Sequence, residues 1–154
     1  METHEYRAEL TWTGSTAAGY RGYDRAHRVR TPPAAQELVM TADPAFLGDV
    51  SLLNPEQLLT AAASSCQLLS FLALAARARL DVVSYVCSAV AHMPMATARI
   101  ETIVLTPTIT VRAPADQAAV VALVHEAHET CFIARSLNTD VQVHAIVEIA
   151  RTDV

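Results

Sequence analysis

The feature that most constrains this 154-residue chain is an uncharged run of 20 residues from Gln57 to Ala76. A helix of that length measures about 30 Å, which matches the hydrocarbon thickness of a membrane. The flanks carry no positive cluster beyond Arg77 and Arg79, and much of the apolar content is alanine. The run also contains polar side chains, namely Thr60, Ser64, Ser65, Gln67 and Ser70. We therefore expect a helix buried between a sheet and another surface, in a protein without a membrane-spanning segment.

The start of this helix is marked by three residues. Asn54 is a favoured N-cap, and Pro55 suits the first helical position, where its missing N–H costs nothing. Gln57 follows three residues after Asn54, the spacing of a capping box. These signals predict that the helix begins at Asn54-Pro55.

Alternating apolar and polar residues predict strands on both sides of the long helix. A second helix is expected over 115–130, with a short helical turn after Cys131. Strands followed by a helix, strands, a helix and a strand indicate an α+β fold, in one domain spanning 1–154. The expected strands cover 5–13, the segment from near Arg25 to Arg30, 37–41, 82–92, 99–112 and 141–150.

Composition excludes several classes of function. Lysine is absent, since all 11 basic residues are arginine, so Schiff-base chemistry and a P-loop lysine are impossible. The net charge is −5 and the arginines cluster only at Arg21–Arg30, so a nucleic-acid partner is not expected. Hydrophobic residues make up 52% and charged residues 18%, which favours self-association. The polar segment Met1–Arg7 resembles no signal peptide, which predicts a cytoplasmic protein with reduced cysteines.

Two of the three cysteines belong to the predicted helical regions. Cys66 lies in the middle of the long helix beside Ser64, Ser65 and Gln67, and Cys131 lies at the break after the second helix. Each could be a small apolar residue of the core, or a reactive thiol. They are 65 positions apart, so they could pair only if the two helices pack together, which the sequence leaves open. Cys87 lies within a strand and is assigned to packing.

The histidines provide a weaker alternative. His125 and His128 are three residues apart on one predicted helix and could bind a metal together with a cysteine. No third ligand lies at a suitable spacing, and His27 is distant in sequence. A metal-binding module is therefore the third interpretation, and no metal or other cofactor is expected.

The helix start and the second cysteine together resemble the OsmC/Ohr family, the osmotically inducible and organic hydroperoxide resistance proteins. The first motif is Asn54-Pro55-Glu56-Gln57-Leu58-Leu59, an Ala-rich turn, and Cys66 ten residues after Glu56. The second is Cys131-Phe132-Ile133-Ala134-Arg135-Ser136-Leu137. The segment Tyr23-x-Arg25-x-His27, and Phe132 where better-known members carry Pro, are similar to a separate OsmC-like branch.

The resemblance implies antiparallel sheets packed on a long central helix, in an intertwined homodimer. It also implies a thiol peroxidase in which Cys66 attacks an organic hydroperoxide and becomes a sulfenic acid. Cys131 then forms a disulfide with Cys66, and an external dithiol, of lipoyl type for example, reduces it. An arginine that holds Cys66 as thiolate is expected at either Arg21 or Arg25, and both remain open.

Glu56 adds a constraint on the assembly. It lies ten residues before Cys66, or about 15 Å along one helix, so the two cannot share a salt-bridge network within a straight helix. Our hypothesis is that Glu56 and the arginine of one subunit face Cys66 of the other subunit. Within the first turn, Glu56 also has a simpler role as a favourable charge at the helix N-terminus.

The apolar residues near the cysteines favour an alkyl or acyl substrate over hydrogen peroxide. They are Leu69, Phe71 and Phe132, and core packing explains them equally well. The alternative function is a catalytically weak protein of the same fold that binds a small hydrophobic ligand or acts as a redox sensor. A cysteine that reacts slowly with peroxide would favour that alternative.

Overall fold

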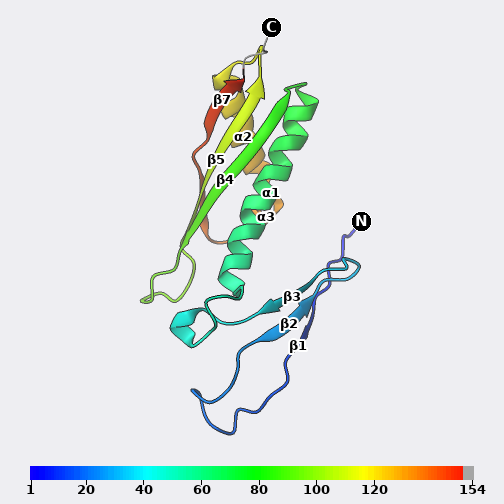
Figure 1. Cartoon of the computed structure of the whole chain (residues 1–154). Coiled ribbons are helices and arrows are strands. Elements are labelled where there is room, and N and C mark those ends of the chain that lie inside the picture. Colours follow the sequence, from blue (N-terminus) through cyan, green and yellow to red (C-terminus); the bar gives the residue numbers. More distant parts are fainter. Residues whose placement is uncertain (151–154) are drawn as a thin grey trace. The chain divides into compact units, whose positions relative to one another are not determined.

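The computed structural model describes residues 1–150, which form two compact units (Figure 1). The first unit is Met1–Leu58 and the second begins at Leu59. The expectation of a single domain over 1–154 stays a prediction, and its last four residues lie outside the described part.

The first unit contains a three-stranded antiparallel sheet in the order β1-β2-β3. Its strands are β1 (Glu9–Thr11), β2 (His27–Arg30) and β3 (Glu37–Met40). The 3₁₀ helix η1 (Pro44–Phe46) follows β3. Asp43 caps its start, because the Asp43 carboxylate accepts a hydrogen bond from Ala45 N at 2.8 Å. The sequence predicts a strand over 5–13, but pairing with β2 is limited to three residues.

The long helix α1 (Pro55–Arg77) begins where the sequence predicts. Asn54 Oδ1 accepts a hydrogen bond from Gln57 N at 2.9 Å, and Gln57 Oε1 accepts from Asn54 N at 3.1 Å. This reciprocal pair is the predicted capping box, and it satisfies two backbone donors that the helix itself leaves without partners. The capping-box prediction is confirmed.

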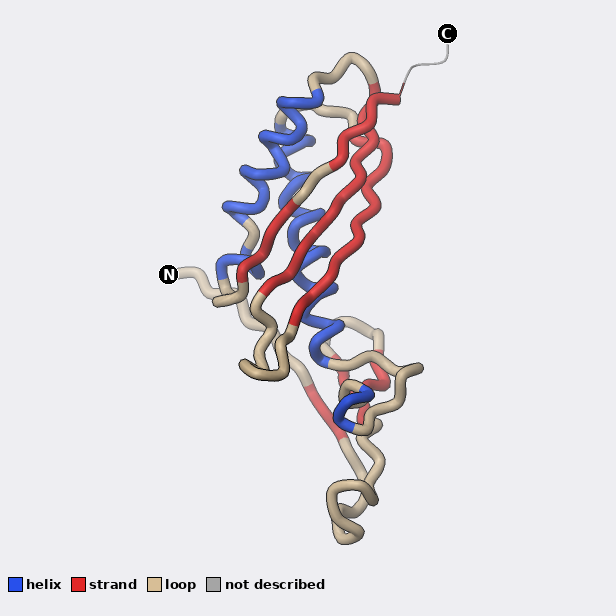
Figure 2. Tube along the Cα trace, turned by 90° about the vertical axis from the view of Figure 1, so that its left-hand side faces the viewer, coloured by secondary structure: helices blue, strands red, loops and turns tan. Residues whose placement is uncertain are grey.

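The second unit contains a mixed sheet covered by helices on one side (Figure 2). Its strands β4 (Val82–His92) and β5 (Thr102–Arg112) are antiparallel. The helices α2 (Gln117–Thr130) and α3 (Phe132–Arg135) follow, and then the strands β6 (Asp140–Val143) and β7 (Ile146–Ala150). Both of these last strands run parallel to β5, so the sheet is mixed rather than wholly antiparallel. The predicted single closing strand over 141–150 is divided in two.

The core of the second unit lies between this sheet and the two long helices. Alternate residues of β5 from Ile103 to Val111 are buried, as expected for one face of a strand. Each helix buries one stripe: Ala63, Gln67, Phe71 and Ala75 on α1, and Val120, Val124 and Ala127 on α2. The α1 stripe repeats every four residues, which is the spacing of one helical face.

Much of the apolar surface of α1 remains exposed within this chain. By its length and composition alone this helix could cross a membrane. Of the residues in its most apolar stretch, 22% are buried within the structure. Its buried stripe nevertheless belongs to the core of the second unit. Leu69 and Leu72 are 64% and 38% exposed. This pattern is explained if one stripe of the helix packs on the sheet and a second apolar stripe packs on another surface.

Candidate active site

Cys66 and Cys131 meet in the second unit. Cys66 lies half-buried on α1, and Cys131 lies buried at the junction of α2 and α3. Both are free thiols, and their side chains are hydrogen-bonded to each other. The two helices therefore do pack together at this point, which the sequence left open. Gln67, next to Cys66, strengthens the contact, because its Nε2 donates to the carbonyl of Val124 on α2 at 3.0 Å.

The surroundings of Cys66 favour its thiolate form. Burial acts to raise the pKa of this thiol, but four hydrogen bonds outweigh burial, and the pKa lies below its ordinary value. The Cys131 thiol contributes the largest of these hydrogen bonds. The backbone N–H groups of Ile133 and Phe132 and the hydroxyl of Ser70 supply the others. A thiolate is the nucleophilic form of cysteine, so this environment prepares Cys66 for attack on an electrophile.

Cys131 is affected in the opposite direction. Burial raises the pKa of its thiol, and the hydrogen bond to Cys66 raises it further, against weaker backbone contacts from Ala134 and Ile133. The Cys66 thiol therefore loses its proton at a lower pH than the Cys131 thiol does.

The local fold explains why backbone donors point at Cys66. Cys131 ends α2 in an extended conformation (φ −66°, ψ 116°), while its N–H still donates to His128 O at 3.2 Å. Arg135 N then donates to Cys131 O at 3.0 Å as α3 begins. The N–H groups of the first turn of a helix have no intrahelical acceptor. The N–H groups of Phe132 and Ile133 are therefore available to the sulfur of Cys66.

The three apolar residues singled out beside the cysteines have different positions. Phe71 is fully buried in the core, against Tyr85 at 5.9 Å between ring centroids, so its role is packing. Leu69 and Phe132 are 64% and 76% exposed. These two are available to contact an apolar substrate or a partner chain.

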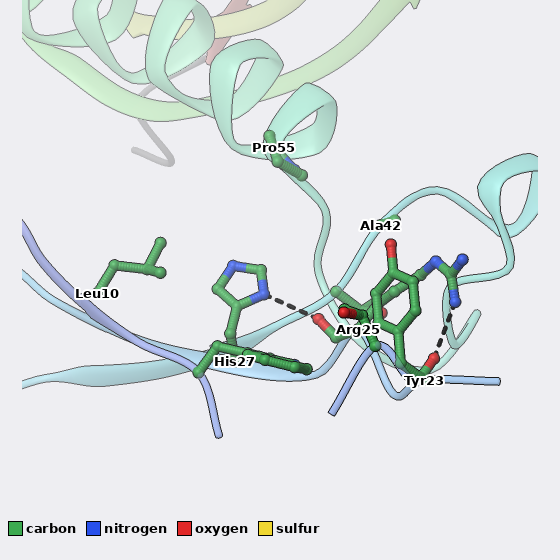
Figure 3. A pocket seen from close by; sticks show the side chains of 9 residues that line it. Leu10, Tyr23, Arg25, His27, Ala42 and Pro55 are labelled. Atoms are coloured by element: carbon green, nitrogen blue, oxygen red, sulfur yellow. Dashed lines mark hydrogen bonds between the residues drawn. The ribbon is translucent and has the colours of Figure 1, made fainter. Parts of the chain in front are cut away.

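Arg25 lies in the first unit and lines a cavity of about 410 Å³ (Figure 3). Its Nη1 donates to Tyr23 O at 2.9 Å and its Nη2 to Tyr20 O at 2.6 Å. The guanidinium carbon lies 4.1 Å from the centroid of the Tyr23 ring and 4.9 Å from that of Tyr20. Two carbonyls and two aromatic faces therefore hold the cation in one position. Arg21 lies in an exposed turn, so of the two candidate arginines Arg25 is the one built into a cavity.

The remaining candidates are distributed as follows. Glu56 lies half-buried in the first turn of α1. Cys87 lies on β4, and its thiol donates to Ser88 O at 3.5 Å. The nearby Tyr85 has a strongly raised pKa because of burial and the adjacent Cys87. Among the described residues, no group of three or more His, Cys, Asp or Glu side chains is arranged to hold a metal ion.

Several parts of both sites were missed by sequence reasoning. Ser70 lies four residues after Cys66 on one helix, a spacing that places two side chains on the same face, so a readable signal was present. The two backbone N–H donors depend on the conformation of Cys131, which leaves no mark in the residue types. In the first unit, Trp12 and Thr41 directly follow β1 and β3, the two neighbours of β2, and line the cavity with Arg25, which precedes β2.

Comparison with known proteins agrees with this architecture. An OsmC-like protein of unknown function from Vibrio cholerae has a similar structure, with a TM-score of 0.84 and 28% identity over 94% of this chain and 100% of that one. An organic hydroperoxide resistance protein from Legionella pneumophila is similar at a TM-score of 0.68 and 18% identity, over 96% of this chain and 99% of that one. The organic hydroperoxide resistance protein OhrB of Bacillus subtilis is similar at a TM-score of 0.57 and 19% identity, over 94% of this chain and 98% of that one.

At these identities the Legionella and Bacillus proteins show a shared fold. No curated protein matches the sequence. The model of the OsmC-like protein family matches residues 48–145, which is more than half of the chain and includes both Cys66 and Cys131. The chain therefore belongs to the OsmC/Ohr family of OsmC-like proteins.

Proposed function

We propose that this protein is a cysteine-based peroxidase that reduces organic hydroperoxides in oxidative-stress defence. Family membership and the hydroperoxide resistance proteins among its structural neighbours support a role in peroxide resistance. The observation that carries the finer proposal is the hydrogen-bonded pair of Cys66 and Cys131, in which one thiol has a lowered pKa and the other a raised pKa. That asymmetry suits a nucleophile and its resolving thiol.

The reaction begins with the thiolate of Cys66 attacking the terminal oxygen of the hydroperoxide. The S–O bond forms as the O–O bond breaks, sulfur gives up two electrons, and the departing alkoxide takes a proton to become an alcohol. Cys66 is left as a sulfenic acid. The sulfur of Cys131 then attacks the sulfur of Cys66 and water leaves, which gives a disulfide. An external dithiol, a lipoyl-type thiol for example, returns both cysteines to thiols at the cost of its own oxidation.

The exposed apolar residues at this site support an organic substrate. Leu69 and Phe132 border the cysteine pair in the chain and present apolar surface to their surroundings. Contact with an alkyl or aryl group would remove this surface from water, whereas hydrogen peroxide offers no apolar group. Alkyl or aryl hydroperoxides are therefore the proposed substrates.

A homodimer completes the proposal. Within Pro55–Arg77 the exposed apolar face of α1 carries no charge from Gln57 to Ala76, as expected for a helix covered by a second copy. In that dimer Arg25 and Glu56 of one subunit face Cys66 of the partner subunit: the guanidinium holds the thiolate, and the carboxylate orients the guanidinium. Arg25 is preferred to Arg21 because it is anchored in a cavity. The active dimer is cytoplasmic, where a dithiol reductant is available.

Single-turnover oxidation of the fully reduced protein tests the function. Cumene hydroperoxide is mixed with wild type, Cys66→Ser, Cys131→Ser and Cys87→Ser, and free thiols are counted over time. We expect wild type and Cys87→Ser to lose two thiols quickly and to form a 66–131 disulfide by mass spectrometry. Cys66→Ser should not react. Cys131→Ser should stop after one turnover, with a sulfenic acid trapped by dimedone.

Hydrogen peroxide serves as the comparison substrate in the same experiment and should react more slowly. A wild-type protein that retains all its thiols with both peroxides would contradict the peroxidase. The ligand-binding or sensor alternative would then explain the same fold.

A further inference from the structure

His27 lines the same cavity as Arg25 and is the first residue of β2. Arg25 lies two residues before His27, just outside the strand. The ring of His27 stands away from the strand on the side where Pro55 lies (Figure 3). The cavity belongs wholly to the first unit. Its lining consists of Leu10, Trp12, Thr16, Tyr23, Arg25, His27, Thr41, Ala42 and Pro55.

One hydrogen bond fixes the tautomer of His27. Its Nδ1 lies 2.9 Å from the backbone carbonyl oxygen of Arg25. A carbonyl oxygen can only accept, so Nδ1 carries the hydrogen and donates it. In the neutral ring Nε2 is then left with a free lone pair. When Nε2 takes up a proton, Nδ1 keeps its bond to the carbonyl, so the ring need not turn between the two states.

The charge of the cavity suits a substrate that loses a proton during reaction. Arg25 and Tyr23 are the other titratable side chains in the lining, and none of the described lining residues is acidic. The walls are otherwise mostly apolar, including Trp12 and Leu10. Such walls suit an apolar hydroperoxide, and the guanidinium of Arg25 and the bare Nε2 of His27 are polar groups of the same cavity.

We propose that His27 is a catalytic proton relay that moves the hydroperoxide proton from one oxygen to the other. This inference rests on the proposed function, in which the Arg25 cavity receives Cys66 of the partner subunit. Nε2 takes the proton of the terminal oxygen as the thiolate attacks that oxygen. As the O–O bond breaks, Nε2 gives this proton to the departing alkoxide. The products are a neutral alcohol and a sulfenate on Cys66, which takes a proton from water to become the sulfenic acid, and His27 ends as it began.

The value of such a relay depends on the leaving group. An alkoxide is a strong base and a poor leaving group, so proton transfer during bond cleavage typically accelerates its departure by 10²–10⁴-fold. A peroxy acid releases a carboxylate, which departs without a proton. The relay therefore predicts a different dependence on His27 for the two kinds of peroxide.

The test compares cumene hydroperoxide with peroxybenzoic acid on wild type and His27→Asn. Asparagine retains an amide N–H near the position of Nδ1, which preserves the hydrogen bond to the Arg25 carbonyl, but it lacks the basic nitrogen. The second-order rate of Cys66 oxidation is measured by stopped flow. We expect His27→Asn to lose about 100-fold with cumene hydroperoxide and less than about 3-fold with peroxybenzoic acid.

The ratio of the two rates separates the relay from a structural role, because a partly unfolded sample lowers both rates by the same factor. Equal losses with both peroxides, or no loss with either, would overturn the relay while leaving the peroxidase in place. A wild-type protein inert to both peroxides would overturn the proposed function and the relay together. Trp12→Phe, which alters the cavity wall without removing a base, is the control and should leave the ratio unchanged.

Discussion

The thiol of Cys131 hydrogen-bonds to the sulfur of Cys66, and this contact lowers the pKa of Cys66 while it raises the pKa of Cys131. The relation arises from packing α1 against the junction of α2 and α3 within the second unit. It means that the two sulfurs, 65 residues apart in sequence, are in direct contact. The reactivity of Cys66 is therefore expected to depend on the residue at position 131.

The first prediction concerns the pH dependence of Cys66. A lowered pKa lets the Cys66 thiol ionise at a lower pH than it would at its ordinary value. Cys131→Ala removes the largest hydrogen bond to this thiolate, so the midpoint of the alkylation profile should move to higher pH. Cys131→Ser keeps a donor and should move it less. Alkylation by iodoacetamide, followed by mass spectrometry of the peptide that contains residue 66, measures both shifts. An identical midpoint in all three proteins would contradict the contact.

The second prediction concerns Ser70. Its hydroxyl donates to the Cys66 sulfur from one turn further along α1. Ser70→Ala should raise the pKa of Cys66, by less than Cys131→Ala does, and Ser70→Thr should restore the wild-type value because it keeps the hydroxyl. Ser64→Ala, on the same helix, is the control. The pH dependence of alkylation is measured for each variant. A Ser70→Ala profile that matches wild type would exclude a role for this hydroxyl in lowering the pKa of Cys66.

The third prediction concerns the buried Gln67. Its Nε2 donates to Val124 O, while its Oε1 is buried without a hydrogen-bond partner in the structure. Gln67→Met keeps the volume, loses one hydrogen bond of about 1 kcal/mol and removes an unsatisfied acceptor that costs a similar amount. The free energy of unfolding should therefore change by less than about 1 kcal/mol, whereas the cavity of Gln67→Ala should cost about 2 kcal/mol or more. Urea unfolding of both variants measures these changes. A large loss of unfolding free energy in Gln67→Met would indicate that Oε1 has a partner, such as buried water.

Local signals were the most predictable part of the fold. The Asn54–Gln57 capping box was predicted correctly because every atom of it lies within four consecutive residues. The bounds of β4 were predicted correctly, since its apolar alternation lies between two clear breaks. The short turn after Cys131 was also predicted, and it is α3.

Features that depend on distant partners were not predictable in the same way. Alternation over 5–13 continues beyond the three residues of β1 that find a partner on β2. The last strand is divided because its two halves pair with separate parts of β5, at Thr102–Leu105 and Thr108–Arg112. Its parallel direction is likewise a tertiary property.

In the candidate site, too, local features were predictable from sequence and long-range contacts were not. The two cysteines were selected from sequence, but their contact and the direction of each pKa shift required the packing of three helices. The choice between Arg21 and Arg25 was open in the sequence because both lie in one polar segment. The structure distinguishes them by the cavity and by the carbonyls that hold Arg25.

The fourth prediction concerns the helix start. Asn54 is 4% exposed and its side chain caps Gln57 N. Asn54→Ala should lower the free energy of unfolding by about 1 kcal/mol, within the usual 0.5–2 kcal/mol range for a lost cap. Asn54→Asp keeps an acceptor and should retain most of the stability. Thermal unfolding compares the two; equal losses would show that burial of the residue, not its cap, is the important property.

The last prediction concerns the proposed homodimer. Leu72 is 38% exposed on the uncharged face of α1, and a charge placed there would have to be buried if a second copy covers this face. Leu72→Glu should therefore give a monomer in sedimentation velocity at micromolar concentration, where we expect wild type to be a dimer. It should also lose peroxidase activity, because Arg25 and Glu56 are proposed to come from the partner subunit. Ala122→Glu places the same charge on the exposed side of α2 and should remain dimeric and active. A Leu72→Glu monomer with full activity would contradict the shared site while leaving the thiol chemistry intact.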